Sequence, residues 1–172
     1  MIEVAIQTVL GIVYLLVQIF FFDLIRIEGW AYPHIAPIWI LFLPVTTNRY
    51  LLYSSAFIFG IALDITLLPL GLQSICLMAL CVARNPWIRL ISPQITSLKT
   101  DGINFQAQSY LWKLLYVLPL LGFYSLLYQI LYQFSWARFS SILIQSAGGS
   151  LFSMIISSLI LLFFYNPDVG RK

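Results

Sequence analysis

Six apolar stretches, separated by short polar segments, fill most of the chain. We expect each to form a helix, and the expected helices cover about residues 4–22, 31–45, 50–68, 72–89, 112–134 and 142–165. None of the stretches shows the two-residue alternation of barrel strands, and in lipid a helix satisfies its own backbone hydrogen bonds. A stretch of about 19 residues rises roughly 28 Å, close to the thickness of a hydrocarbon core of about 30 Å. The pattern predicts an all-α polytopic membrane protein, with residues 1–172 forming one bundle of six transmembrane helices.

Two places depart from this regular pattern. The stretch 31–45 is short for a lone span and carries Pro33, Pro37 and Pro44, so we expect neighbouring helices to cover it. The longest polar segment, about 85–111, is expected as a cytoplasmic loop. A shorter break at Pro69, Leu70 and Gly71 predicts a tight turn between the third and fourth helices.

Composition supports a membrane location. Hydrophobic residues make up 61% of the chain and charged residues 9%, and the mean hydropathy is +0.94. A chain of this composition cannot cover its surface with polar groups, so we expect lipid to be its solvent. The net charge of +3 then reflects orientation in the membrane and not a nucleic-acid partner.

The basic residues predict the orientation. With six spans, both termini lie on one side, and that side is cytoplasmic if the positive-inside rule holds. Seven of the nine basic residues then fall on the inner side, namely Arg49, Arg84, Arg89, Lys99, Lys113, Arg171 and Lys172, which leaves Arg26 and Arg138 outside. We expect a multi-pass membrane protein with both termini in the cytoplasm and with its first helix retained as an anchor.

Asp64 is the acid that lies deepest in an expected span. It shares one helix face with Ala56 and Gly60, so it sits on a strip of small residues that another backbone can approach closely. A carboxylate in a membrane is costly unless it is paired, hydrated or protonated. It can bond the free N–H groups at the start of the fourth helix or pair with Arg26 or Arg138, and we favour such an architectural role over an ion or proton site.

A second strip of small residues lies on the last helix. Gly149, Ser153 and Ser157 recur every four residues, and such strips let helices pack closely in lipid. They are a possible face for a partner helix, which belongs either to this chain or to another protein. Glutamines in the spans are candidates for hydrogen bonds between helices, namely Gln7, Gln18, Gln129, Gln133 and Gln145.

No pattern of residues points to catalysis. Cys76 and Cys81 do not share a helix face, so they predict neither a zinc pair nor a mutual disulfide. His34 is the sole histidine and is expected as a loop or interface residue. Nucleophile elbow, metalloprotease and phosphate-loop motifs are absent from the sequence. We expect a non-enzymatic protein without cofactor or metal.

The stretch from Tyr32 to Pro93 resembles the MreD family of bacterial rod-shape-determining membrane proteins. The resemblance is carried by "YPHIAPIWILFLP" and "FIFGIALDITLLPLGLQS", in which Asp64 follows Gly60 by four residues and Pro69 and Gly71 mark the turn. The continuation "RNPWIRLISP" also matches. About 60 residues match well, and the first, fifth and sixth helices match in hydropathy alone.

The resemblance implies a multi-pass protein of the bacterial cytoplasmic (inner) membrane, a scaffold of the cell-elongation complex that maintains cell shape. Such proteins act with MreC and, through it, with MreB filaments, with RodA and with the transpeptidase partner of RodA in peptidoglycan synthesis. We expect the cytoplasmic loop to contact MreB or another cytoplasmic element. The family is also similar to substrate-binding subunits of energy-coupling-factor vitamin transporters, which is the alternative. Those subunits commonly carry Ala-x-x-x-Ala on the first helix, whereas this chain has Ala5 followed by Val9.

Overall fold

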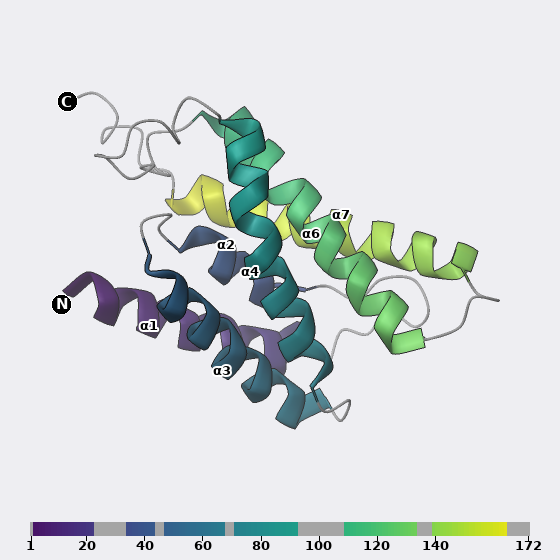
Figure 1. Cartoon of the computed structure of the whole chain (residues 1–172), viewed down its shortest axis with the longest axis horizontal. Helices are drawn as coiled ribbons and strands as arrows, with labels where there is room; N and C mark the ends of the chain where they lie inside the picture. Colours follow the sequence, from purple (N-terminus) through teal and green to yellow (C-terminus); the bar gives the residue numbers. More distant parts are fainter. Residues whose placement is uncertain are drawn as a thin grey trace.

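The chain folds into helices. The computed structural model describes residues 2–22, 34–43, 47–67, 71–92, 109–133 and 139–164, and within these ranges it contains helices and no strand (Figure 1). This confirms the expected all-α class. The helices are α1 (Ile2–Val17) with a π-helical continuation η1 (Gln18–Phe22), α2 (Ala36–Phe42), α3 (Arg49–Leu67), α4 (Leu72–Ile91), α6 (Tyr110–Gln133) and α7 (Phe139–Phe164).

The long apolar stretches match these helices to within about three residues at the described ends, but the second stretch does not. The expected helix at 31–45 is wrong in extent, because α2 covers only Ala36–Phe42. Pro37 lies in its first turn, where a missing N–H costs nothing. Leu43 adopts an extended conformation with ψ of 141°, as expected of a residue that precedes a proline.

The polar loop expected at about 85–111 is also shorter in the structure. The α4 helix continues through Pro86 to Ile91, and α6 begins at Tyr110. Packing against α6 explains the extra turn, because Ile88 is buried and the Trp87 indole Nε1 donates to the Leu115 carbonyl at 3.3 Å. The loop's central part, 93–108, lies outside the described residues, as does its expected contact with a cytoplasmic partner.

Three helices are long and apolar enough to cross a membrane by length and composition, counted over the described residues. They are Leu72–Ile91, Leu111–Gln133 and Ser140–Leu159. Large apolar side chains point outward from the helices, such as Ile58 on α3, Val82 on α4 and Ile155 on α7. An outer surface of this kind suits lipid contact, so the coarse prediction of an α-helical membrane protein agrees with the structure.

From α3 onward the helices pack in chain order, and α2 lies at the centre. The α3 and α4 helices form a hairpin around Gly71, α4 also packs against α6, and α6 packs against α7. In Figure 1, α2 lies behind α4, and it contacts α1, α4 and α6. Gly11 of α1 lies against the ring of Trp39 on α2, where a Cβ atom would stand 2.7 Å from two ring carbons. The core is thus built around a helix of only seven residues.

Candidate functional site

The short α2 helix is buried along its length. Ile38, Ile40 and Leu41 have no exposed surface, and Trp39 stacks on Phe59 of α3 with ring centroids 4.8 Å apart. A helix leaves N–H groups unpaired at its start and carbonyl groups unpaired at its end. In apolar surroundings, an unpaired N–H or carbonyl group costs roughly several kcal/mol of free energy unless another part of the chain forms a hydrogen bond with it. The ends of α2 therefore need polar partners.

Side chains from α1 and α7 bond the start of α2. Gln18, in the π-helical turn η1, accepts hydrogen bonds at its Oε1 from the Ile35 and Ala36 N–H groups, at 2.7 and 3.4 Å. The Ser153 hydroxyl of α7 accepts from the His34 N–H at 2.9 Å. Gln18 was expected to bond between helices, and this contact confirms it. Gln133 of α6 donates to Gln145 of α7 at 2.5 Å, which confirms a second pair.

Arg84 and Tyr116 bond the end of α2. The guanidinium of Arg84 donates to the Leu43 carbonyl, and its Nε donates to the Tyr116 hydroxyl at 2.8 Å. The Tyr116 hydroxyl donates to the Leu41 carbonyl at 3.1 Å. A cation beside the carbonyl end of a helix is favoured by the helix dipole. Arg84 and Tyr116 therefore stabilise the truncated end of α2.

The position of Arg84 corrects the charge count. That count places Arg84 on the inner surface, but its side chain is 2% exposed and lies inside the bundle. A signal for this exists in the sequence, because Gln73, Leu77, Leu80, Arg84 and Ile88 follow the helical period, and all five are buried on one face of α4. An arginine on the same helix face as a row of buried residues is expected to form hydrogen bonds inside the protein.

Asp64 bonds the start of α4. Its two carboxylate oxygens accept from the Gln73 N–H at 2.8 Å, the Ser74 N–H at 3.1 Å and the Ser74 hydroxyl at 2.6 Å. Gly71 precedes α4 with φ of 91° and makes no side-chain cap, so Asp64 supplies the cap from the preceding helix. These are the contacts that the architectural interpretation of Asp64 expects. The alternative pairing with Arg26 or Arg138 lies outside the described residues.

The other residues of the expected Asp64 strip lie beside it. Ala56 is fully buried, and Gly60 lies against Ser74 of α4. Gly71 has the left-handed backbone conformation that favours glycine at a turn. Pro69 lies outside the described residues.

A line of contacts joins the start of α4, where Asp64 lies, to the start of α2, where Ser153 lies. The Tyr124 hydroxyl of α6 donates to Gln73 Oε1, and the edge of the Tyr124 ring meets His34 with centroids 5.0 Å apart. Tyr128 meets the same histidine at 4.7 Å. His34 lies outside the helices, just before α2, as expected of a loop residue, but its side chain is buried among aromatic rings and is 2% exposed. Asp64, Gln73, Tyr124, His34 and Ser153 thus connect four helices.

The small-residue strip of α7 faces the protein interior. Gly149 is buried, and Ser153 and Ser157 are 1% and 2% exposed. Of the two alternatives for a partner helix, the structure places this chain's own helices on the strip. A helix from another protein cannot lie on it without displacing the start of α2. Ser157 Oγ is buried without a hydrogen-bond partner among the described residues.

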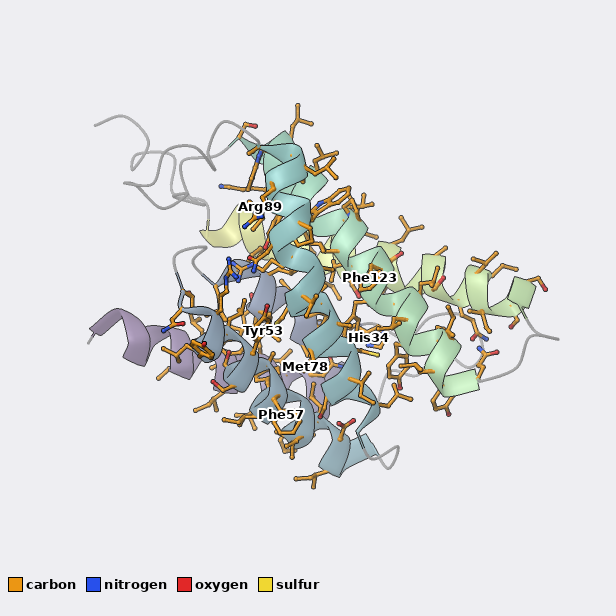
Figure 2. All side chains as sticks on the ribbon, in the orientation of Figure 1. His34, Tyr53, Phe57, Met78, Arg89 and Phe123 are labelled. Carbon is orange, nitrogen blue, oxygen red and sulfur yellow. The ribbon has the colours of Figure 1, made fainter. Side chains whose placement is uncertain are left out.

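Two grooves lie on the outside of the α3–α4 hairpin. The first, the apolar groove, has a volume of about 450 Å³ and is lined chiefly by Phe57, Ile61, Asp64, Ile65, Ile75 and Met78. The second, the arginine groove, has a volume of about 560 Å³ and is lined chiefly by Arg49, Tyr53, Val82, Asn85, Arg89 and Leu90. Figure 2 shows Tyr53 and Phe57 on α3, Met78 on α4 and Arg89 farther along α4.

No protein-family model, curated protein or solved structure matches this chain.

The described polar groups of the interior mainly serve the backbone. Asp64, Arg84, Gln18 and Ser153 each bond a main-chain group at a helix end. Among the described residues, no three metal-ligating side chains gather, and Cys76 and Cys81 are buried free thiols. What this arrangement does chemically is to hold a short helix and a helical hairpin in fixed positions.

Proposed function

We propose that this chain is a non-enzymatic membrane scaffold of the bacterial cell-elongation complex. Its partner is MreC, and through MreC it helps couple MreB to RodA and the transpeptidase in peptidoglycan synthesis. The support is the resemblance of residues 32–93 to MreD proteins and the use of interior polar groups in holding helices together. In this proposal the chain crosses the inner membrane six times, with both termini in the cytoplasm.

One observation carries the proposal. Asp64 lines the apolar groove, yet its carboxylate oxygens accept three hydrogen bonds from Gln73 and Ser74 of the same hairpin. An acid that is bonded in this way stabilises the groove wall, and a transported ion or proton would have to compete with these bonds. The groove therefore suits packing against another helix better than ion coupling.

The remaining lining of the groove fits a transmembrane segment of a partner. Phe57, Ile61 and Ile65 of α3 are 49%, 41% and 73% exposed, and Ile75 of α4 is 59% exposed. Lipid tails are as apolar as these side chains, so shape and close packing decide which helix binds. We place the single span of MreC along this groove, in place of the inward-facing strip of Gly149, Ser153 and Ser157.

The transporter alternative requires a pocket of vitamin size inside the bundle. The described interior between α2, α4 and α6 is filled by large side chains, since Arg84, Tyr116 and Tyr124 are all almost fully buried there. No described contact favours that alternative.

Co-purification tests the proposal. Full-length protein with Ile61→Trp fills the apolar groove and is expected to recover about tenfold less MreC in detergent, equivalent to about 1.4 kcal/mol of binding free energy. Ile144→Trp is the matched control, because Ile144 is 59% exposed on α7, away from the groove. Equal MreC recovery by both variants would contradict the proposed surface. Recovery of an ATPase pair with a coupling subunit would instead support transport.

A further inference from the structure

The arginine groove has a feature that a scaffold of helices does not require. It lies between the first turns of α3 and the last turns of α4, at the end of the hairpin opposite Gly71. Arg49 and Arg89 line it from different helices, and both side chains are exposed. Neither guanidinium bonds a described residue, in contrast to Arg84, which bonds Leu43 and Tyr116. Two cations thus share one open groove.

The charge of Arg49 is unfavourable for its own helix. Arg49 is the first residue of α3, and the N-terminal end of a helix already carries partial positive charge. Arg89 lies in the last turn of α4, where a cation is favoured by that helix's dipole. Compensation of the helix dipole therefore explains Arg89 but not Arg49. An anion between the two side chains would neutralise both.

No acidic side chain among the described residues reaches this groove. Asp64 is the carboxylate whose contacts the structure gives, and it bonds the opposite end of α4. About ten residues of helix, or roughly 15 Å, separate Ser74 from Arg84, and Arg89 lies farther still. The groove is therefore complementary to an anion from outside the described chain.

Two observations place this groove at the depth of lipid headgroups. It lies at the end of the candidate span Leu72–Ile91. Trp87 and Trp112 lie at the same end, and their indole N–H groups donate to the Leu115 carbonyl and the Ser92 hydroxyl. Tryptophans of this kind concentrate at membrane interfaces, where one edge of the ring is polar and the rest is apolar.

The rest of the groove lining is apolar. Val82 and Leu90 are 60% and 73% exposed on α4, and Tyr53 lines the opposite wall from α3. A free phosphate gains nothing from such a surface, whereas the first carbons of an acyl chain bury apolar area against it. Basic grooves between transmembrane helices are suited to anionic lipid headgroups.

We propose that the arginine groove binds an anionic phospholipid. The lipid phosphate lies between the Arg49 and Arg89 guanidinium groups, which donate charge-assisted hydrogen bonds to its oxygens. The acyl chains run from there along Val82 toward the hydrocarbon core. This binding is independent of MreC and goes beyond the scaffold function.

Native mass spectrometry of the full chain in a neutral detergent tests the lipid site. Phosphatidylglycerol is expected to bind at least about tenfold more tightly than phosphatidylcholine. The double variant Arg49→Gln, Arg89→Gln is expected to lose this preference. The matched control is Arg26→Gln, Arg138→Gln, which removes two charges that the sequence places on the other side of the membrane and is expected to keep the preference.

A second variant tests the acyl-chain contacts at unchanged charge. Val82→Trp fills the apolar part of the groove and is expected to weaken phosphatidylglycerol binding about tenfold, with helical content unchanged by circular dichroism. If the double arginine variant fails to fold, Val82→Trp and single Arg49→Gln decide the question. Equal lipid binding by wild type and these variants would overturn the proposal. Displacement of the lipid by millimolar inorganic phosphate, with normal binding by Val82→Trp, would also overturn it in favour of a free-phosphate site.

Discussion

The Cα atom of Ser74 lies 2.4 Å from the position that a Cβ atom on Gly60 would take. The same serine donates its hydroxyl to Asp64 Oδ2 at 2.6 Å. Gly60 and Asp64 are one turn apart on α3, so both face the start of α4. The glycine admits the backbone of α4, and the acid one turn later bonds the N–H groups that this approach brings near. The spacing of Gly60 and Asp64 thus has a geometric reason in the hairpin.

Gly60→Ala is expected to destabilise the protein. The new methyl group would overlap the Ser74 backbone, which cannot move away as a flexible side chain can, and overpacking of this kind costs about 1–3 kcal/mol. Gly122→Ala on α6 is the matched control, because a Cβ atom there meets nothing within 4 Å. Better helix propensity should leave that variant unchanged or more stable by up to about 1 kcal/mol. Thermal unfolding in detergent measures both, and equal melting temperatures would refute the close contact.

Asp64→Asn is expected to keep the fold and lose stability. The amide nitrogen cannot accept the Ser74 N–H, and the charge that favours a helix N-terminus is removed. Loss of a cap of this kind costs about 0.5–2 kcal/mol. Ser74→Ala removes one of the same bonds and should shift the melting temperature in the same direction. An Asp64→Asn protein of normal stability and normal MreC recovery that had lost ion coupling would instead identify an ion or proton site.

The long helices could be predicted because each is a continuous apolar run that lipid forces to bond internally. The extent of α2 could not be predicted, because its ends are bonded by side chains that lie far away in the sequence. Gln18 lies 17 residues from Ile35, and Arg84 lies 41 residues from Leu43. Pro37 and Pro44 lie near the two ends of α2, but the apolar run itself gives no sign of these distant partners.

The candidate site was predictable where its contacts are local. Asp64 reaches residues nine and ten positions later across one turn, so a bond to the next helix could be proposed from spacing alone. Whether the strip of Gly149, Ser153 and Ser157 faces inward or outward could not be predicted, because this depends on which segment lies against α7. That segment is His34, 119 residues away, and nothing in the local pattern of either points to the other.

Tyr116→Phe is expected to destabilise the end of α2. The substitution leaves the Leu41 carbonyl and the Arg84 Nε–H without their hydroxyl partner in a buried place, which costs about 1–3 kcal/mol. Tyr132→Phe is the matched control on the same helix, because Tyr132 is 57% exposed. Thermal unfolding of both variants checks the prediction. If the two melt alike, the Arg84–Tyr116 contact does not support the fold.

Ser153→Ala is expected to destabilise the isolated protein. The change removes the acceptor of the buried His34 N–H, at a cost of about 1–3 kcal/mol. Ser150→Ala is the control, because the Ser150 hydroxyl donates to the Ala147 carbonyl of its own helix. Unfolding is measured on the purified chain without MreC. If Ser153→Ala leaves stability unchanged but abolishes MreC recovery, the strip binds a helix of the partner protein instead.

The six-span layout predicts which loops face the cytoplasm. Lys99→Cys and Arg171→Cys are expected to resist a membrane-impermeant thiol reagent added outside spheroplasts, and Arg138→Cys is expected to react. The native cysteines can stay in place, because Cys76 and Cys81 have no exposed surface and should not react in the folded protein. Permeabilised cells provide the control that every introduced thiol is reactive. Labelling of Lys99→Cys but not Arg171→Cys would mean an odd number of spans between them, and the proposed topology of the scaffold would then be wrong.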